Sequence, residues 1–227
     1  MVTFAQIQNL LRRKYTLPLI GIVTVFFISP LIEGFSRFFP LPQFLVMVIV
    51  LSLLRSLGVK KGLLFFLLAL TATSLSADMY YRFHYGRGNT MPAVLALGLF
   101  LPAVMLYCTA IILILSEVFK EKTVTSDTVW GGIMVYFFIG IMWARLFHLA
   151  AALSPHAFVP TLTLSDPFQF FYFSLATLTT LGYGDISPGN HLTMILAVLE
   201  SSVGQVYLAV FVARLIGLEI SNRRNGI

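Results

Sequence analysis

Six apolar stretches, most of them close to the length of a membrane-crossing helix, limit the folds that this chain can adopt. A helix needs about 20 mostly apolar residues to cross the hydrocarbon core of a bilayer. Of the 227 residues, 58% are hydrophobic and only 11% are charged, so a water-soluble core is not expected. The sequence predicts an all-α membrane protein with six transmembrane helices, over residues 15–33, 41–54, 62–77, 91–117, 128–153 and 192–218.

Two further features of the apolar stretches bear on the fold. The stretches at 41–54 and 62–77 are short, about 14 and 16 residues against the usual requirement, and either could be tilted, re-entrant or longer. A seventh apolar stretch, 168–180, is too short to span and leads into the sequence TLTTLGYGDISP at 177–188. We therefore expect a re-entrant helix and loop between the last two spans.

Basic residues at the ends of the apolar stretches indicate an orientation. With the N-terminus in the cytoplasm, most Lys and Arg fall on the cytoplasmic side, as the positive-inside rule requires. The first stretch follows Arg12, Arg13 and Lys14 without a cleavage site, which indicates a retained helix rather than a signal peptide. We expect both termini to be cytoplasmic and residues 154–190 to lie on the outer side.

The same pattern divides the chain into five segments. The net charge of +6 comes from residues at helix ends rather than from one basic stripe, so it does not indicate nucleic-acid binding. The basic amphipathic N-terminus could contact membrane lipids at the inner surface or be the frayed start of the first helix. The predicted segments are 1–14 (amphipathic N-terminus), 15–118 (four-helix module), 119–127 (charged cytoplasmic linker), 128–220 (helix, re-entrant segment and helix) and 221–227 (short cytoplasmic tail).

The stretch at 177–188 places polar and small residues between strongly apolar segments. Backbone without helical or sheet pairing is tolerated at membrane depth only where protein buries it or where it lines a water-filled cavity. Because glycine adopts positive φ without a Cβ clash, Gly182 and Gly184 would let consecutive carbonyls face one side. Residues 180–183 would then offer a ladder of oxygen ligands to a monovalent cation.

A longer pattern surrounds these glycines. It reads T-x-x-T-x-G-Y-G-D and consists of Thr177, Thr180, Gly182, Tyr183, Gly184 and Asp185. This pattern resembles the signature of potassium channels, over roughly residues 130–218, and is most like that of the bacterial ion-channel pore family. The resemblance implies that backbone carbonyls of residues 180–183 bind K+, that the Thr180 hydroxyl forms the innermost site, and that Thr177, Gly184 and Asp185 support the filter.

The resemblance also implies an assembly and a location. One filter segment per chain cannot encircle an ion, so a four-fold homotetramer is expected. The expected location is the bacterial inner (plasma) membrane. By the same resemblance, Gly204 would be the hinge of the inner helix.

The residues around the predicted filter fit a short pore helix. Asp166 followed by Pro167 gives an N-cap with proline at the first helical position, and Gln169 has the spacing of a capping box. The C-terminal end of this helix would point toward the cavity, where its partial negative charge favours a cation.

Side chains near the filter carry further expectations. Tyr183 would point away from the ions and pack against Tyr172 and Phe173 of the pore helix. Leu181 stands where valine or isoleucine is most usual in the resembled family, and its larger side chain would pack behind the filter. A pore-helix glutamate found in some members is replaced by Ala176.

The predicted helix at 91–117 occupies the place of a voltage sensor in six-helix channels. It contains no Arg or Lys before Lys120. Because voltage gating draws its energy from charges moving across the membrane field, conventional voltage gating is not expected. The short tail after Leu218 also leads us to expect no regulatory ligand-binding domain.

Two ionisable residues lie deep in the predicted spans. Arg145 and Glu200 are each roughly 12 to 15 Å from the outer end of their helices, which permits an intramembrane ion pair behind the filter. Arg145 could instead extend toward the outer interface, and Glu200 could be protonated, hydrogen-bonded or facing the cavity. His191 follows the filter, and protonation of its imidazole in acid would repel cations at the outer mouth.

Two alternatives to a potassium channel remain at this point. Altered packing at Leu181 would leave a weakly selective cation channel of the same architecture. The run at 182–185 also matches the G-x-G-D motif of intramembrane aspartyl proteases, but that chemistry needs a second aspartate close by. Asp78 is the candidate on the outer side, and it lacks the sequence context of that family's first motif.

Overall fold

Nearly all of the described chain is helical. The structure, a computed structural model, describes residues 14–28, 41–84, 92–164 and 166–224. The elements are α2 (Thr16–Ile28), α4 (Leu41–Ser56), α5 (Lys61–His84), α6 (Ala93–Lys120), α7 (Ser126–Leu153), β1 (Phe158–Val159), α8 (Pro167–Leu178), β2 (Ser187–Pro188) and α9 (His191–Arg224). The predicted amphipathic N-terminus at 1–13, the end of the first predicted span at 29–33 and the tail at 225–227 lie outside the described residues.

Three of the described helices are long and apolar enough to cross a membrane, at Ala96–Lys120, Ser126–Leu153 and His191–Arg223. The apolar parts of α2, α4 and α5 are shorter, although α5 as a helix continues beyond the predicted end at residue 77. The chain is therefore an integral membrane protein of α-helices. Six crossings per chain remain a prediction.

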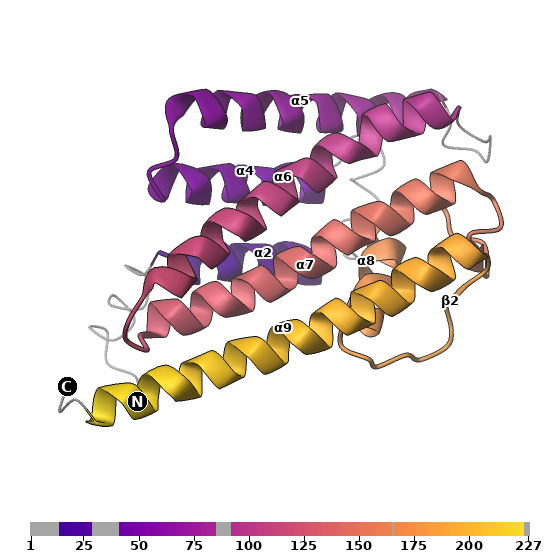
Figure 1. Cartoon of the computed structure of the whole chain (residues 1–227). Helices are drawn as coiled ribbons and strands as arrows, with labels where there is room; N and C mark the ends of the chain where they lie inside the picture. Colours follow the sequence, from indigo (N-terminus) through magenta and orange to yellow (C-terminus); the bar gives the residue numbers. More distant parts are fainter. Residues whose placement is uncertain (1–13, 29–40, 85–91, 165, 225–227) are drawn as a thin grey trace.

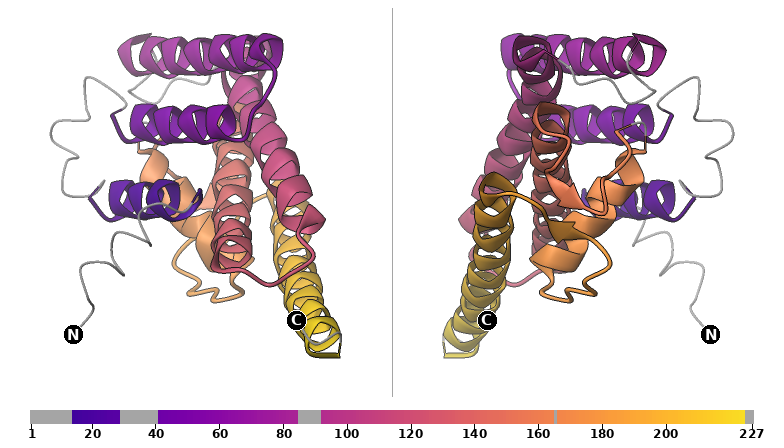
Figure 2. Two further views of the ribbon diagram at one scale, coloured as in Figure 1. Left: turned by 90° about the vertical axis from the view of Figure 1, so that its left-hand side faces the viewer. Right: turned by 90° about the vertical axis from the view of Figure 1, so that its right-hand side faces the viewer.

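The helices form two groups that differ in direction. Helices α6, α7 and α9 run alongside one another, and the short α8 lies beside α7 and α9 (Figure 1). Helices α2, α4 and α5 are stacked one above the next and run across the direction of α6, α7 and α9 (Figure 2). The predicted pore module, residues 128–220, thus forms one side of the molecule, and most of the predicted four-helix module forms the other.

Helix α7 lies at the centre of the fold, with α6, α8, α9 and α2 packed around it. The helices associate through their apolar side chains because van der Waals contacts at the density of a protein interior stabilise helix pairs in a membrane. The buried core is built from side chains that include Leu19, Ile22, Met47, Val50, Leu106, Ile114, Met134 and Phe138. This core fixes the helix against which the pore loop packs.

The pore loop is fastened at both ends. Asp166 accepts a hydrogen bond from the Phe168 amide at 3.0 Å with Pro167 at the first helical position, so the predicted cap of α8 is confirmed. Gln169 does not complete the expected capping box, because its Oε1 accepts from the Thr163 amide instead. At the other end, the strands β1 and β2 pair antiparallel just before α9 begins.

Candidate functional site

The loop after α8 has an alternating backbone conformation. Thr180, Gly182 and Gly184 have positive φ angles of 58°, 55° and 80°, and elsewhere in the described chain only Gly58 shares this conformation. The sequence predicted it for the two glycines but not for Thr180. A β-branched residue in this region is strained, and such strain is typical of functional sites.

The amides of this loop point back to the end of α8. Leu181 and Gly182 donate to the Ala176 carbonyl at 2.8 and 3.2 Å, and Thr180 donates to the Thr177 carbonyl at 3.0 Å. Within the described part of the chain, the carbonyl oxygens of residues 180–183 accept no backbone hydrogen bond. Residues 180–183 are exposed in the single chain, and ion binding by their carbonyl oxygens stays a prediction.

Tyr172 holds the outer end of the loop. Its hydroxyl donates to Asp185 Oδ2 at 2.7 Å, and its ring stacks on Tyr183 with centroids 6.2 Å apart and an interplanar angle of 2°. The hydrogen bond to the Asp185 carboxylate raises the pKa of Tyr172 to about 12, so the hydroxyl keeps its proton at neutral pH. The structure thus brings together Tyr172, Tyr183 and Asp185.

Phe173 does not contact Tyr183 through its ring, contrary to the sequence-based expectation. It is buried on the other side of α8, edge-on to Phe147 and Phe158 at centroid distances of 4.8 and 5.1 Å. Adjacent residues of a helix point about 100° apart, so Tyr172 and Phe173 cannot both face the filter. Phe173 instead anchors α8 to α7.

Gly204 lies where the end of α8 comes closest to α9. A Cβ at this position would lie 2.6 Å from the Leu178 carbonyl oxygen. Helix α9 runs through Gly204 without a break, so the residue allows close packing here, and its role as a hinge stays a prediction. Tyr136 of α7, which the sequence analysis missed, donates to the same Leu178 carbonyl at 3.1 Å.

The predicted ion pair between Arg145 and Glu200 is wrong for the single chain. Among the described residues no salt bridge joins them, and Ser174 of α8 is hydrogen-bonded to Glu200 Oε1. The two residues have similar predicted depths, but depth alone does not fix the direction of a side chain on a helix.

The remaining predicted site residues lie around the loop. Thr177 is partly buried in the last turn of α8, and His191 is the exposed first residue of α9. The side chain of Leu181 is 55% exposed in the single chain, so the described residues cover it only in part, and its packing behind the filter stays a prediction.

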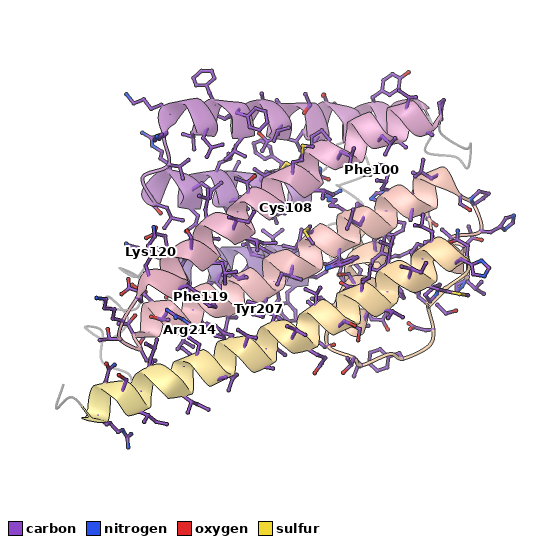
Figure 3. All side chains as sticks on the ribbon, viewed as in Figure 1. Phe100, Cys108, Phe119, Lys120, Tyr207 and Arg214 are labelled. Atoms are coloured by element: carbon purple, nitrogen blue, oxygen red, sulfur yellow. The ribbon has the colours of Figure 1, made fainter. Side chains whose placement is uncertain are left out.

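A contact at the far end of α9 was not predicted. Arg214 Nη2 donates to the carbonyls of Val118, Phe119 and Glu121 at 3.2, 2.6 and 3.0 Å, and its guanidinium lies 4.3 Å from the centroid of the Phe119 ring (Figure 3). A cation at a helix C-terminus is favourable because the last carbonyls carry partial negative charge. The available signal was that Arg214 is the single arginine in the predicted span 192–218.

Comparisons with known proteins find sequence similarity over the segment that contains this loop. Residues 143–218, from the middle of α7 to near the end of α9, match the ion channel family. A segment of 57 residues is 40% identical to the Two-pore potassium channel 4 of Arabidopsis thaliana. That match covers 25% of this chain and 20% of the relative, and no solved structure matches the chain. The comparisons support a pore segment of the potassium-channel family.

The same comparisons point away from the protease alternative and toward a channel without enzymatic chemistry. Asp185 is hydrogen-bonded to Tyr172. The side chain of Asp78, the other aspartate considered, lies outside the described part of the structure.

Proposed function

We propose that this chain is one subunit of a tetrameric, potassium-selective channel that conducts K+ passively through the carbonyls of residues 180–183. The observation that carries this proposal is the alternation of positive φ at Thr180, Gly182 and Gly184. Unpaired filter carbonyls and the ion channel match over 143–218 support it.

In the proposed channel, each subunit contributes one ladder of oxygens to rings around a central axis. Carbonyl dipoles replace the hydration shell of the ion, so K+ moves through without covalent chemistry. The stack of Tyr172 on Tyr183 and the hydrogen bond to Asp185 would hold the ring at its diameter. The exposed apolar face of α9 supplies surface for neighbouring subunits and for lipid.

Gating in this proposal does not use a conventional voltage sensor. Helix α6 carries no Arg or Lys before Lys120 at its end, so little charge is available to move in the membrane field. The proposed orientation puts both termini in the cytoplasm and the outer mouth of the filter near His191. Protonation of His191 is then proposed to reduce the current when the outer solution is acidified.

The test is the reversal potential of the purified protein in a planar bilayer with K+ on one side and Na+ on the other. We expect a potential strongly biased toward K+. Gly182→Ala should remove the selective current, because alanine is strained at a φ of 55°. Gly98→Ala in α6, where nothing lies within 4 Å of an added Cβ, is the matched control. An assembled protein that passes K+ and Na+ equally would contradict the proposed selectivity.

A weakly selective cation channel is a second candidate because of Leu181. Its exposed side chain is larger than the valine of the resembled motif, and its packing depends on neighbouring subunits. The Leu181→Val variant distinguishes the two candidates. A K+/Na+ permeability ratio that rises sharply in this variant would favour the second candidate, whereas an unchanged high ratio would favour the first.

A further inference from the structure

We propose that Glu200 is held in its neutral, protonated form and that, through Ser174, it positions the pore helix between α7 and α9. This role rests on the proposed channel function, but it concerns a buried junction behind the filter rather than the ion path. Three helices meet there, with Glu200 on α9, Ser174 on α8 and Gly140 on α7.

The number of hydrogen-bond donors at this junction indicates that the Glu200 side chain is a protonated carboxylic acid. The Ser174 hydroxyl lies 2.7 Å from the Gly140 carbonyl oxygen and is also hydrogen-bonded to Glu200 Oε1. A hydroxyl carries one proton, and a carbonyl oxygen can only accept. When Ser174 donates to Gly140, the second hydrogen bond needs a proton on Glu200. A carboxylic acid supplies that proton and a carboxylate does not.

The opposite assignment leaves an unfavourable contact. If Ser174 gave its proton to an ionised Glu200, the oxygens of Ser174 and Gly140 would face each other at 2.7 Å with no hydrogen between them. Two acceptors at hydrogen-bond distance repel, so α8 would have to move away from α7. The observed geometry therefore corresponds to the protonated acid.

The surroundings of Glu200 also disfavour a charge. The side chain is fully buried, and among the described residues no salt bridge reaches it and its Oε2 has no hydrogen-bond partner. The tyrosines presented by α7 and α8 are engaged elsewhere, Tyr136 with a backbone carbonyl and Tyr172 with Asp185. An unpaired buried carboxylate costs far more free energy than a buried neutral acid.

The junction is connected to the filter through the last turns of α8. Ser174 precedes Ala176 by two residues, and the Ala176 carbonyl accepts from the amides of Leu181 and Gly182. A displacement of α8 at Ser174 would carry this carbonyl with it and change the direction of the filter carbonyls. Glu200 thus acts on ion selectivity as a positioning residue, without touching the ions.

Isotope-edited infrared spectroscopy of the assembled protein tests the protonation state directly. At neutral pH the wild type should show the C=O stretch of a protonated carboxylic acid that disappears in Glu200→Gln. The band should shift in Ser174→Ala, because the acid loses its acceptor. Absence of the band, or a band unaffected by Ser174→Ala, would overturn the proposal. This readout needs no current, so it is independent of whether the pore selects K+.

Permeability measurements test the positioning role. Glu200→Gln keeps a neutral donor toward Ser174 and should retain the wild-type K+/Na+ permeability ratio. Glu200→Ala should lower the ratio by about two- to tenfold, the scale of one net hydrogen bond. If Glu200→Ala assembles poorly, Ser174→Ala should show the same reduction. A ratio unchanged in both Glu200→Ala and Ser174→Ala, or equally reduced in Glu200→Gln, would contradict the positioning role.

Discussion

Helices α7 and α9 are both long and apolar enough to cross a membrane, yet their surroundings differ greatly. Within the chain, 72% of the apolar stretch of α7 is buried, against 17% for that of α9. Helix α7 packs mainly against other helices of the same chain. Helix α9 leaves apolar side chains exposed along its length, among them Ile195, Val198, Val203, Val206, Val210 and Ile216. The difference indicates that α9 completes its packing outside the single chain.

The pore helix makes a different kind of contact with each of these two helices. Against α9, the Leu178 backbone carbonyl lies 2.6 Å from where a Cβ of Gly204 would be. Against α7, the nearest atom to a Cβ at Gly140 is the Cδ2 methyl carbon of Leu175, at 2.9 Å. Backbone cannot move aside locally, whereas the end of a leucine side chain can change rotamer. We therefore expect the two glycines to respond very differently to substitution.

Gly204→Val should give the largest effect. Its side chain would collide with the Leu178 carbonyl and separate α9 from α8, and overpacking of this kind costs about 1–3 kcal/mol or more per subunit. We expect loss of the selective current and a lower midpoint of thermal unfolding for the assembled protein. Gly217→Ala on the same helix, with nothing within 4 Å of its Cβ, serves as the control. A Gly204→Val protein with normal stability and current would refute the close contact.

Arg214→Ala tests the attachment that the guanidinium makes between the far end of α9 and the end of α6. The variant removes hydrogen bonds from the guanidinium to three carbonyls, and we expect destabilisation of about 1–2 kcal/mol. Thermal unfolding of the purified protein measures it.

Arg223→Ala provides the comparison for this variant. Arg223 pairs with Glu219 at 3.0 Å on the exposed surface of α9, and such pairs contribute about 0–1 kcal/mol. Equal effects of the two substitutions would mean that Arg214 does not anchor α9.

These contacts also mark what the sequence could predict. Hydrophobic length located the helices, Asp166 and Pro167 located the start of α8, and the two glycines predicted the conformation of the loop. Positive φ at Thr180 could not be predicted, because the intrinsic preference of a β-branched residue opposes it and only the surrounding structure imposes it.

The sequence also could not predict the direction in which a side chain points around its helix. Arg145 and Glu200 have similar predicted depths, but among the described residues no salt bridge joins them, and Glu200 is hydrogen-bonded to Ser174 of α8 instead. Ser174 was missed because a serine in a helix more often bonds its own backbone than a buried acid. Each of these residues owes its role to tertiary contacts rather than to its neighbours in sequence.

Gly140→Ala should give the smallest effect of the series, and it sharpens the contrast between α7 and α9. The added methyl meets the ends of the Leu175 and Leu178 side chains, at 2.9 and 3.5 Å, and only the closer one must shift. Alanine also favours the helix over glycine by up to about 1 kcal/mol. The two effects offset each other, so we expect an unfolding midpoint and a K+/Na+ permeability ratio close to the wild type. The Gly140 carbonyl that receives the Ser174 hydroxyl is unchanged by the substitution. A loss as large as that of Gly204→Val would mean that α8 packs as rigidly on α7 as on α9, and the distinction between the two helices would then be wrong.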